Sequence, residues 1–261
     1  MTTLRLPHFI IAGAPRSATT WLYMLADRHP AIAMANPVAP EPKFFLVDEL
    51  YEQGLAFYSA TWFAGLAADR LLGEKSTNYL ESPRTAERIR RDLPDVKLVF
   101  MLRNPVDRAW SNYRWSRQNG LETEDFATAL ALEDRREREV PMNLRYARPH
   151  AYFSRGRYAD LLKPYFARFP RTRILVLRAE DAAWDPQGLA ERLHRFLGVM
   201  PRPSDAEGLG TANASADPEP LDPAIRRALE ARYAEPNREL AMLLGPEFAL
   251  WPLDTDRSAG A

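Results

Sequence analysis

The sequence predicts an α/β fold in which helices cover both faces of a parallel β-sheet. Three short apolar runs are typical of buried strands, and they span Phe9–Ala12, Lys97–Leu102 and Arg173–Leu177. Longer segments with helical periodicity lie between them, and strands linked through helices pair in parallel. Several of these segments open with a polar residue followed by proline, which is a common helix start.

The expected elements follow the chain in a regular alternation. Weaker strand candidates lie at 31–35 and 71–73, in addition to the three clear strands. Helices are expected at residues 18–28, 52–64, 83–92, 105–118, 123–138, 155–168, 186–197 and 222–244. Their clearest start signals are Ser82-Pro83, Asn104-Pro105, Asp185-Pro186 and Asp222-Pro223. Residues 200–220 are rich in Pro, Gly, Ala, Ser and Asp, and we expect a long loop there.

Length and composition favour one globular domain. The chain has 261 residues, of which 46% are hydrophobic, so it can bury a substantial core. We expect a single domain over 1–253 and a frayed tail at 254–261. Only one short apolar run, Phe9–Ala12, lies near the start. It is too short for a signal peptide or a membrane span, so we expect a cytoplasmic protein without membrane contact.

Charge and cysteine content exclude several function classes. The 35 basic residues balance 35 acidic ones, which argues against general nucleic-acid or membrane-surface binding. Only four of the basic residues are lysine, namely Lys43, Lys75, Lys97 and Lys163. There is no cysteine, which excludes a disulfide scaffold, a thiolate metal site and a cysteine nucleophile.

The segment after the first strand predicts an anion site. Gly13-Ala14-Pro15-Arg16-Ser17-Ala18-Thr19-Thr20 connects that strand to a helix beginning near Trp21. A strand, a tight loop and a helix start together present backbone N–H groups and a positive helix end to an anion. Ser17, Thr19 and Thr20 add hydroxyl donors, and Arg16 adds a planar charge. The alternative is an ordinary strand–turn–helix connection.

This loop resembles the nucleotide-binding pattern G-x-x-x-x-G-K-[ST] without completing it. Gly13 and Thr20 fit the pattern, but Ala18 replaces its second glycine and Thr19 replaces its lysine. The strand at 97–102 ends in Arg103 where a magnesium-binding aspartate would stand. The sequence therefore predicts a P-loop-like, three-layer fold that binds a phosphate-type anion without magnesium triphosphate.

A second candidate segment runs from Arg103 to Ser111. Arg103 follows a predicted buried strand, at the edge of the sheet where ligands bind in open α/β folds. Ser111 lies two helical turns beyond the predicted cap Asn104. Taken singly, each residue favours a non-functional interpretation, with Arg103 in a surface ion pair and Ser111 as an ordinary helix residue.

Together these segments resemble the sulfotransferases that use 3′-phosphoadenosine 5′-phosphosulfate (PAPS), in the branch of heparan-sulfate-type and many bacterial enzymes. The matching motifs are P-R-S-A-T-T-W at Pro15–Trp21, E-P-K-F-F at Glu41–Phe45, E-K-S-T-N-Y at Glu74–Tyr79 and L-R-N-P-V-D-R-A-W-S-N-Y at Leu102–Tyr113. G-R-Y, F-L-G and L-G-P-E-F-A-L-W follow later, at Gly156, Phe196 and Leu244. The resemblance covers residues 8 to 252. It departs at Ala18, usually glycine in the family, and at Arg16, commonly lysine.

The resemblance implies a set of roles. PAPS would be the sulfuryl donor and adenosine 3′,5′-bisphosphate (PAP) the product, with no metal. Glu41 would be the general base, with Arg16 and Lys75 as the other catalytic residues. The donor would be bound by Arg16, Ser17, Ala18, Thr19, Thr20, Trp21, Arg103, Ser111, Gly210 and Thr211. The acceptor would be a small molecule, a carbohydrate or a natural product, with a hydroxyl or an amine as the sulfated group.

Other readings stay open at this point. A P-loop kinase of small molecules is one, although Thr19 and Arg103 count against it. A protein that binds adenosine bisphosphate without turnover is another, and in it Glu41 is an ordinary loop residue. The four histidines, His8, His29, His150 and His194, show no metal-ligand spacing, and we expect them to be structural or exposed. Nothing in the sequence indicates an oligomeric state.

Overall fold

The computed structural model describes residues 4–141, 146–210 and 220–251. The chain divides into two compact units, one made of residues 1–103 and 164–216 and the other of residues 104–163 and 217–261. A single domain over 1–253 stays a prediction. The expected tail at 254–261 lies outside the described residues.

A parallel five-stranded sheet forms the centre of the first unit. Its strands are β1 (Phe9–Gly13), β2 (Ile32–Met34), β3 (Leu71–Lys75), β4 (Lys97–Leu102) and β5 (Ile174–Arg178). They lie in the order β2-β3-β1-β4-β5, and every pair is parallel. The central strand β1 is thus flanked by β3 and β4, with Ile11 in register with Lys75 on one side and Val99 on the other.

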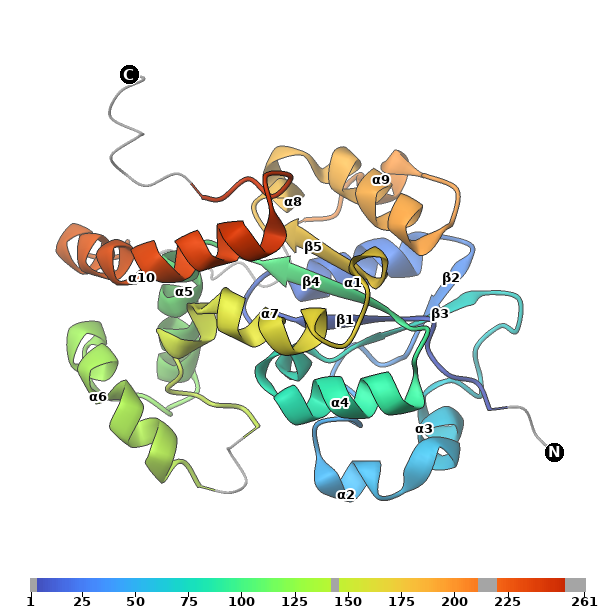
Figure 1. Ribbon diagram of the computed structural model, residues 1–261, viewed down its shortest axis with the longest axis horizontal. Helices are drawn as coiled ribbons and strands as arrows, with labels where there is room; N and C mark the ends of the chain where they lie inside the picture. Colours follow the sequence, from blue (N-terminus) through green and yellow to red (C-terminus); the bar gives the residue numbers. More distant parts are fainter. Residues whose placement is uncertain (1–3, 142–145, 211–219, 252–261) are drawn as a thin grey trace. The chain divides into compact units, whose positions relative to one another are not determined.

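Helices cover both faces of this sheet, as predicted. The helices of the first unit are α1 (Thr19–Arg28), α2 (Asp48–Tyr51), α3 (Gly54–Trp62), α4 (Pro83–Asp92), α8 (Asp181–Trp184) and α9 (Pro186–Leu197), with short 3-10 turns η1 (Thr77–Glu81), η4 (Arg171–Arg173) and η5 (Pro203–Ala206). Phe9 and Val99 share a buried cluster with Leu22 of α1 and Leu193 of α9. Figure 1 shows α9 on one side of the sheet and α4 on the other.

The predicted helix starts are confirmed by their hydrogen bonds. Each proposed cap side chain accepts a backbone N–H from the first turn that follows it. Ser82 accepts from Thr85 (3.2 Å), Asn104 from Val106 (2.9 Å), Asp185 from Gly188 (2.9 Å) and Asp222 from Ala224 (2.6 Å). Because each cap satisfies a donor that the helix itself leaves unpaired, it fixes the residue at which the helix begins.

The second unit has an aromatic core. It contains α5 (Pro105–Gln118), α6 (Phe126–Glu139), η3 (Ser154–Gly156) and α10 (Pro223–Leu244), while α7 (Tyr158–Phe166) runs across the division between the units. Tyr113, Phe126, Tyr152 and Tyr233 belong to one buried cluster. Among the described residues, no helix is long and apolar enough to cross a membrane.

Candidate active site

Three neighbouring strands of the first unit deliver the predicted site residues to one edge of the sheet. The backbone N–H of Ser76, just past β3, donates to the carbonyl of Ile11 in β1 (3.0 Å). The N–H of Ala14, just past β1, donates to the carbonyl of Met101 in β4 (2.9 Å). Lys75, the loop after β1 and Arg103 therefore leave the sheet together, at the carboxyl ends where α/β sheets bind ligands.

Close packing requires glycine at the start of the loop. Gly13 has φ +154°, and a Cβ placed on it would lie 2.7 Å from Leu80 Cβ and 3.0 Å from the carbonyl oxygen of Thr77. Any side chain at this position would push β1 away from η1. Gly13 thus brings the loop close to the segment that follows Lys75.

The loop leaves donors available at the start of α1. Ala18, the residue before the helix, has a left-handed backbone (φ 56°) and offers no side-chain cap. The first N–H bonded within the helix is that of Leu22, which donates to the carbonyl of Ala18 (3.1 Å). Ser17 is fully buried, and its Oγ has no hydrogen-bond partner among the described residues. Uncapped N–H groups, the positive helix end and an unsatisfied hydroxyl fit an anionic group such as phosphosulfate.

The other predicted loop residues divide into two groups. Arg16 is half-buried with a left-handed backbone (φ 67°), and Thr20 is half-buried as well. Thr19 is buried at the first position of α1. Trp21 lies in the core cluster, and its indole Nε1 donates to the carbonyl of Leu209 (3.3 Å). Its ring is thus used in packing, and only its backbone N–H is suited to an anion.

Glu41 and Lys75 form an ion pair at this edge. Lys75 Nζ lies 2.5 Å from Glu41 Oε1, and the two side chains are only 6% and 14% exposed. Both had been predicted as catalytic from separate motifs, and the structure brings them together. Because both side chains are largely shielded from water, their charges attract each other strongly. Each side chain therefore helps to hold the other in place.

Thr77 completes the environment of Glu41, and sequence analysis had assigned it no role. Its backbone N–H donates to Glu41 Oε2 (3.0 Å), and its hydroxyl lies 3.2 and 3.1 Å from Oε1 and Oε2. Both carboxylate oxygens therefore have donors, which fixes the plane of the carboxylate. The only sequence signal for this role is the place of Thr77 two residues after Lys75.

A second buried carboxyl, that of Glu74, lies directly before Lys75. Glu74 is fully buried, and the hydroxyl of Tyr58 donates to its Oε2. The pKa of Glu74 is raised from 4.5 to about 7, mainly by burial and in addition by the nearby charge of Glu41, while hydrogen bonds from Ser76 and Tyr79 act in the opposite direction. This carboxyl therefore exchanges its proton near neutral pH.

The remaining predicted site residues are more dispersed. Arg103 is half-buried and ends the first stretch of the first unit, while Ser111 is half-buried on α5 in the second unit. Their convergence on one ligand group stays a prediction. Gly210 is exposed, and Thr211 lies outside the described residues.

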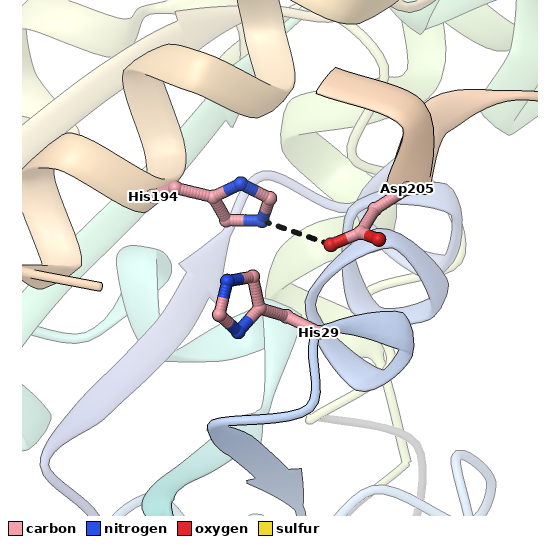
Figure 2. Close-up of side chains that lie close together, drawn as sticks. All are labelled: His29, His194 and Asp205. Atoms are coloured by element: carbon pink, nitrogen blue, oxygen red, sulfur yellow. Dashed lines mark ion pairs between the residues drawn. The ribbon is translucent and has the colours of Figure 1, made fainter. Parts of the chain in front are cut away.

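A separate buried cluster joins His29, His194 and Asp205 (Figure 2). The backbone N–H of Ala31 donates to His29 Nδ1 (3.1 Å), and that of Arg202 donates to His194 Nδ1 (3.2 Å). Rings that accept at Nδ1 carry their proton on Nε2, where a metal would need a lone pair. In addition, His29 Nε2 lies 2.9 Å from the carbonyl of Met200. Through these contacts, the two histidines hold residues 200–205 against α1 and α9.

His194 stays uncharged near neutral pH. Burial, together with His29, lowers the pKa of His194 to about 4. Its Nε2 lies 3.9 Å from Asp205 Oδ2, which is beyond hydrogen-bond distance. Sequence spacing does not reveal the cluster, because α1, α9 and η5 bring its members together from distant parts of the chain.

Comparisons with known proteins identify the family of this chain. The model of the sulfotransferase domain family matches residues 6–209. The human bifunctional heparan sulfate N-deacetylase/N-sulfotransferase 3 is 26% identical over 92% of the chain, and mouse heparan sulfate glucosamine 3-O-sulfotransferase 6 is 28% identical over 94%. The chain spans 30% of the length of the first relative and 73% of that of the second.

Solved structures give the same result. The sulfotransferase from Alicyclobacillus acidocaldarius superposes with a TM-score of 0.76 at 29% identity, covering 92% of this chain and 96% of that one. Mouse sulfotransferase SULT7A1, solved with PAP, shares the fold at a TM-score of 0.56 and 18% identity, covering 90% of this chain and 85% of that one. The predicted fold and family are thereby confirmed, and the chain belongs to the sulfotransferase domain family.

Proposed function

We propose that the chain transfers a sulfuryl group from PAPS to a hydroxyl or amine of an acceptor, with Glu41 as general base. The observation that carries this proposal is the Glu41–Lys75 ion pair, which lies at the same sheet edge as the uncapped loop before α1. Membership of the sulfotransferase family supports the reaction class. That mouse SULT7A1 was solved with PAP supports the choice of donor.

In the proposed step the acceptor oxygen or nitrogen forms a bond to the sulfur atom. The bond between sulfur and the bridging phosphate oxygen breaks, and its electron pair stays on the phosphate, so PAP leaves. Glu41 takes the acceptor's proton. Thr77 holds the Glu41 carboxylate in place from both oxygens. Lys75 then turns from Glu41 toward the departing oxygen and stabilises its charge.

Cationic side chains take the place of a metal in this proposal. Arg16 and Lys75 would stabilise the charge on the sulfuryl and phosphate oxygens, and Arg103 and Ser111 would bind the 3′-phosphate. The loop residues Ser17 to Trp21 would contribute hydroxyl and N–H donors to the 5′ side. Gly210 and Thr211 would bind the 3′ side of the donor.

The acceptor is proposed only as a class. Two relatives carry heparan sulfate in their names, one as an N-sulfotransferase and the other as a 3-O-sulfotransferase. We therefore propose a carbohydrate or another small molecule, including natural products, with either a hydroxyl or an amine as the sulfated group. A cytoplasmic location and a bacterial-type enzyme stay predictions of the sequence.

Ligand-induced thermal stabilisation tests the choice of donor. PAP should raise the melting temperature of the protein by several degrees at concentrations well above its dissociation constant, whereas ATP with magnesium should have little effect. Arg103→Ala should weaken PAP binding far more than adenosine 5′-phosphate binding. Arg84→Ala is the matched control, because Arg84 is an exposed arginine of α4. A stronger response to ATP with magnesium would instead support a small-molecule kinase.

A further inference from the structure

Glu74 and Lys75 occupy consecutive positions of β3 and meet very different surroundings. Successive side chains of a strand point to opposite faces. Lys75 pairs with Glu41, whereas Glu74 has no ion-pair partner among the described residues. Tyr58 donates to its Oε2, and its Oε1 has no hydrogen-bond partner in that same part of the chain. A fully buried carboxyl in this state is costly to ionise.

The groups around Glu74 also contact the segment that carries Glu41. Ser76 Oγ accepts the backbone N–H of Lys43 (2.9 Å), and Tyr79 Oη accepts that of Phe45 (3.2 Å). The ring of Tyr58 stacks on Phe44, with centroids 4.4 Å apart and an interplanar angle of 16°. All three hydroxyl residues that reach Glu74 therefore hold residues 43–45, which directly follow the proposed base.

Few charged groups face this carboxyl. Tyr58 comes from α3, Tyr79 from η1 and Glu41 from the preceding loop. The neighbouring strand β1 places Ile10, an apolar residue, in register with Glu74. If Glu74 ionises, a second negative charge arises near Glu41. This added charge opposes both the binding of an anionic donor and the carboxylate of Glu41.

We propose that Glu74 is a positioning residue that works in its protonated form, holding residues 41–45 against β3 and keeping a second negative charge away from the Glu41–Lys75 pair. This inference rests on the proposed sulfuryl transfer. In this inference the proton on the Glu74 carboxyl takes no direct part in sulfuryl transfer. It affects the reaction through Glu41 and Lys75. The raised pKa of Glu74, about 7, places its ionisation near neutral pH.

Glu74→Gln provides the test, because glutamine has the shape of the protonated acid and cannot ionise. The measurement is kcat/KM for PAPS from pH 6 to pH 8, with the formation of the sulfated acceptor followed directly. The protonated fraction of a group that titrates near pH 7 falls about tenfold over this range. We expect the ratio of Glu74→Gln to wild type to rise by about tenfold between the two pH values. Glu87→Gln, a change at an exposed residue of α4, should keep a constant ratio to wild type.

A second variant separates positioning from simple charge removal. Glu74→Leu removes charge and hydrogen bonds together, so kcat should fall at every pH while PAP affinity changes little. A Glu74→Gln profile that parallels wild type across the range overturns the role of Glu74 and leaves the proposed function intact. A wild-type protein that neither binds PAP nor transfers sulfate overturns the proposed function itself. If Glu74→Leu fails to fold, the Glu74→Gln profile alone decides.

Discussion

Glu41 and Glu74 lie at the same end of β3, in opposite electrostatic conditions. The side chain of Glu41 is 14% exposed and pairs with Lys75. Both of its carboxylate oxygens accept hydrogen bonds from Thr77. Glu74 is fully buried, accepts a hydrogen bond from Tyr58 at Oε2 and lacks a cationic partner among the described residues. The same residue type thus has a cationic partner in one place and a fully buried environment without one in the other. The two roles that we propose follow from this difference in surroundings.

Removing Lys75 should have the largest effect of the predicted substitutions. Lys75→Met leaves Glu41 without its counter-charge, and breaking a buried pair from one side costs about 3–5 kcal/mol of stability. The loss of a group that stabilises the departing oxygen should also lower kcat by about 10²–10³-fold. Urea unfolding and steady-state kinetics measure the two effects.

Lys163→Met is the matched control for this substitution. Lys163 is 53% exposed and pairs with Asp160 and Glu239 on the surface of the second unit. Exposed pairs contribute about 0–1 kcal/mol, so both stability and kcat should stay close to wild type. Equal losses in the two lysine variants would contradict the special position of Lys75.

The stability of Glu74→Gln should depend on pH in a defined direction. The pKa of Glu74 is raised from 4.5 to about 7 in the folded protein, so the folded state holds this proton more tightly than the unfolded state. The wild type should therefore lose stability as the pH rises from about 4.5 to about 7, by up to about 3 kcal/mol. Glu74→Gln lacks this loss.

Urea unfolding of the two proteins at pH 5 and pH 8 measures this difference. The free energy of unfolding of Glu74→Gln relative to wild type should be higher at pH 8 than at pH 5. A relative stability that falls over this range would mean that Glu74 is ionised and paired in the folded protein, contrary to its buried surroundings.

Substitution of Thr77 tests how much the hydrogen bonds to Glu41 contribute. Thr77→Val keeps the backbone N–H but removes the hydroxyl that lies near both carboxylate oxygens. A hydrogen bond to a charged group is worth about 1.5–3 kcal/mol, so kcat should fall by about tenfold or more with unchanged PAP affinity. Thr77→Ser should restore most of the activity, and failure of that rescue would argue that the methyl group, rather than the hydroxyl, matters.

The smallest expected effect concerns the loop before α1. Ala18 adopts φ 56°, a conformation that costs a residue with a Cβ about 1–2 kcal/mol. Ala18→Gly should therefore raise the free energy of unfolding, by about 1 kcal/mol. Ala60→Gly on the exposed face of α3 should lower it by about as much, because glycine weakens a helix interior. Thermal unfolding of both variants checks that Ala18→Gly raises stability and that Ala60→Gly lowers it.

Local signals account for the parts of the molecule that the sequence predicted well. Caps such as Asn104 and Asp185 act within one helical turn, so the starts of the helices that they cap were predicted correctly. The continuous apolar run at 97–102 predicted a buried strand, and β4 covers the same residues. Arg16, Glu41 and Lys75 were predicted as site residues from family motifs. The ion pair between Glu41 and Lys75 was not predicted, because it depends on how β3 meets the loop that carries Glu41.

Other parts depend on tertiary contacts that leave little local trace. The contact of Thr77 with Glu41 and the burial of Glu74 both come from the tertiary fold. The cluster of His29, His194 and Asp205 requires α1, α9 and η5 to meet. The short helices α2 and α8, at residues 48–51 and 181–184, were also missed, because a single turn carries too little periodicity to detect.

Single-turnover sulfuryl transfer by Glu41→Gln tests the central claim most directly. The variant should bind PAP as tightly as wild type, while the transfer rate falls by about 10²–10⁴-fold, because only the proton acceptor has been removed. Glu49→Gln, at an exposed residue of α2, should transfer sulfate at the wild-type rate. A Glu41→Gln rate equal to wild type would contradict the assignment of the base and the site built around it.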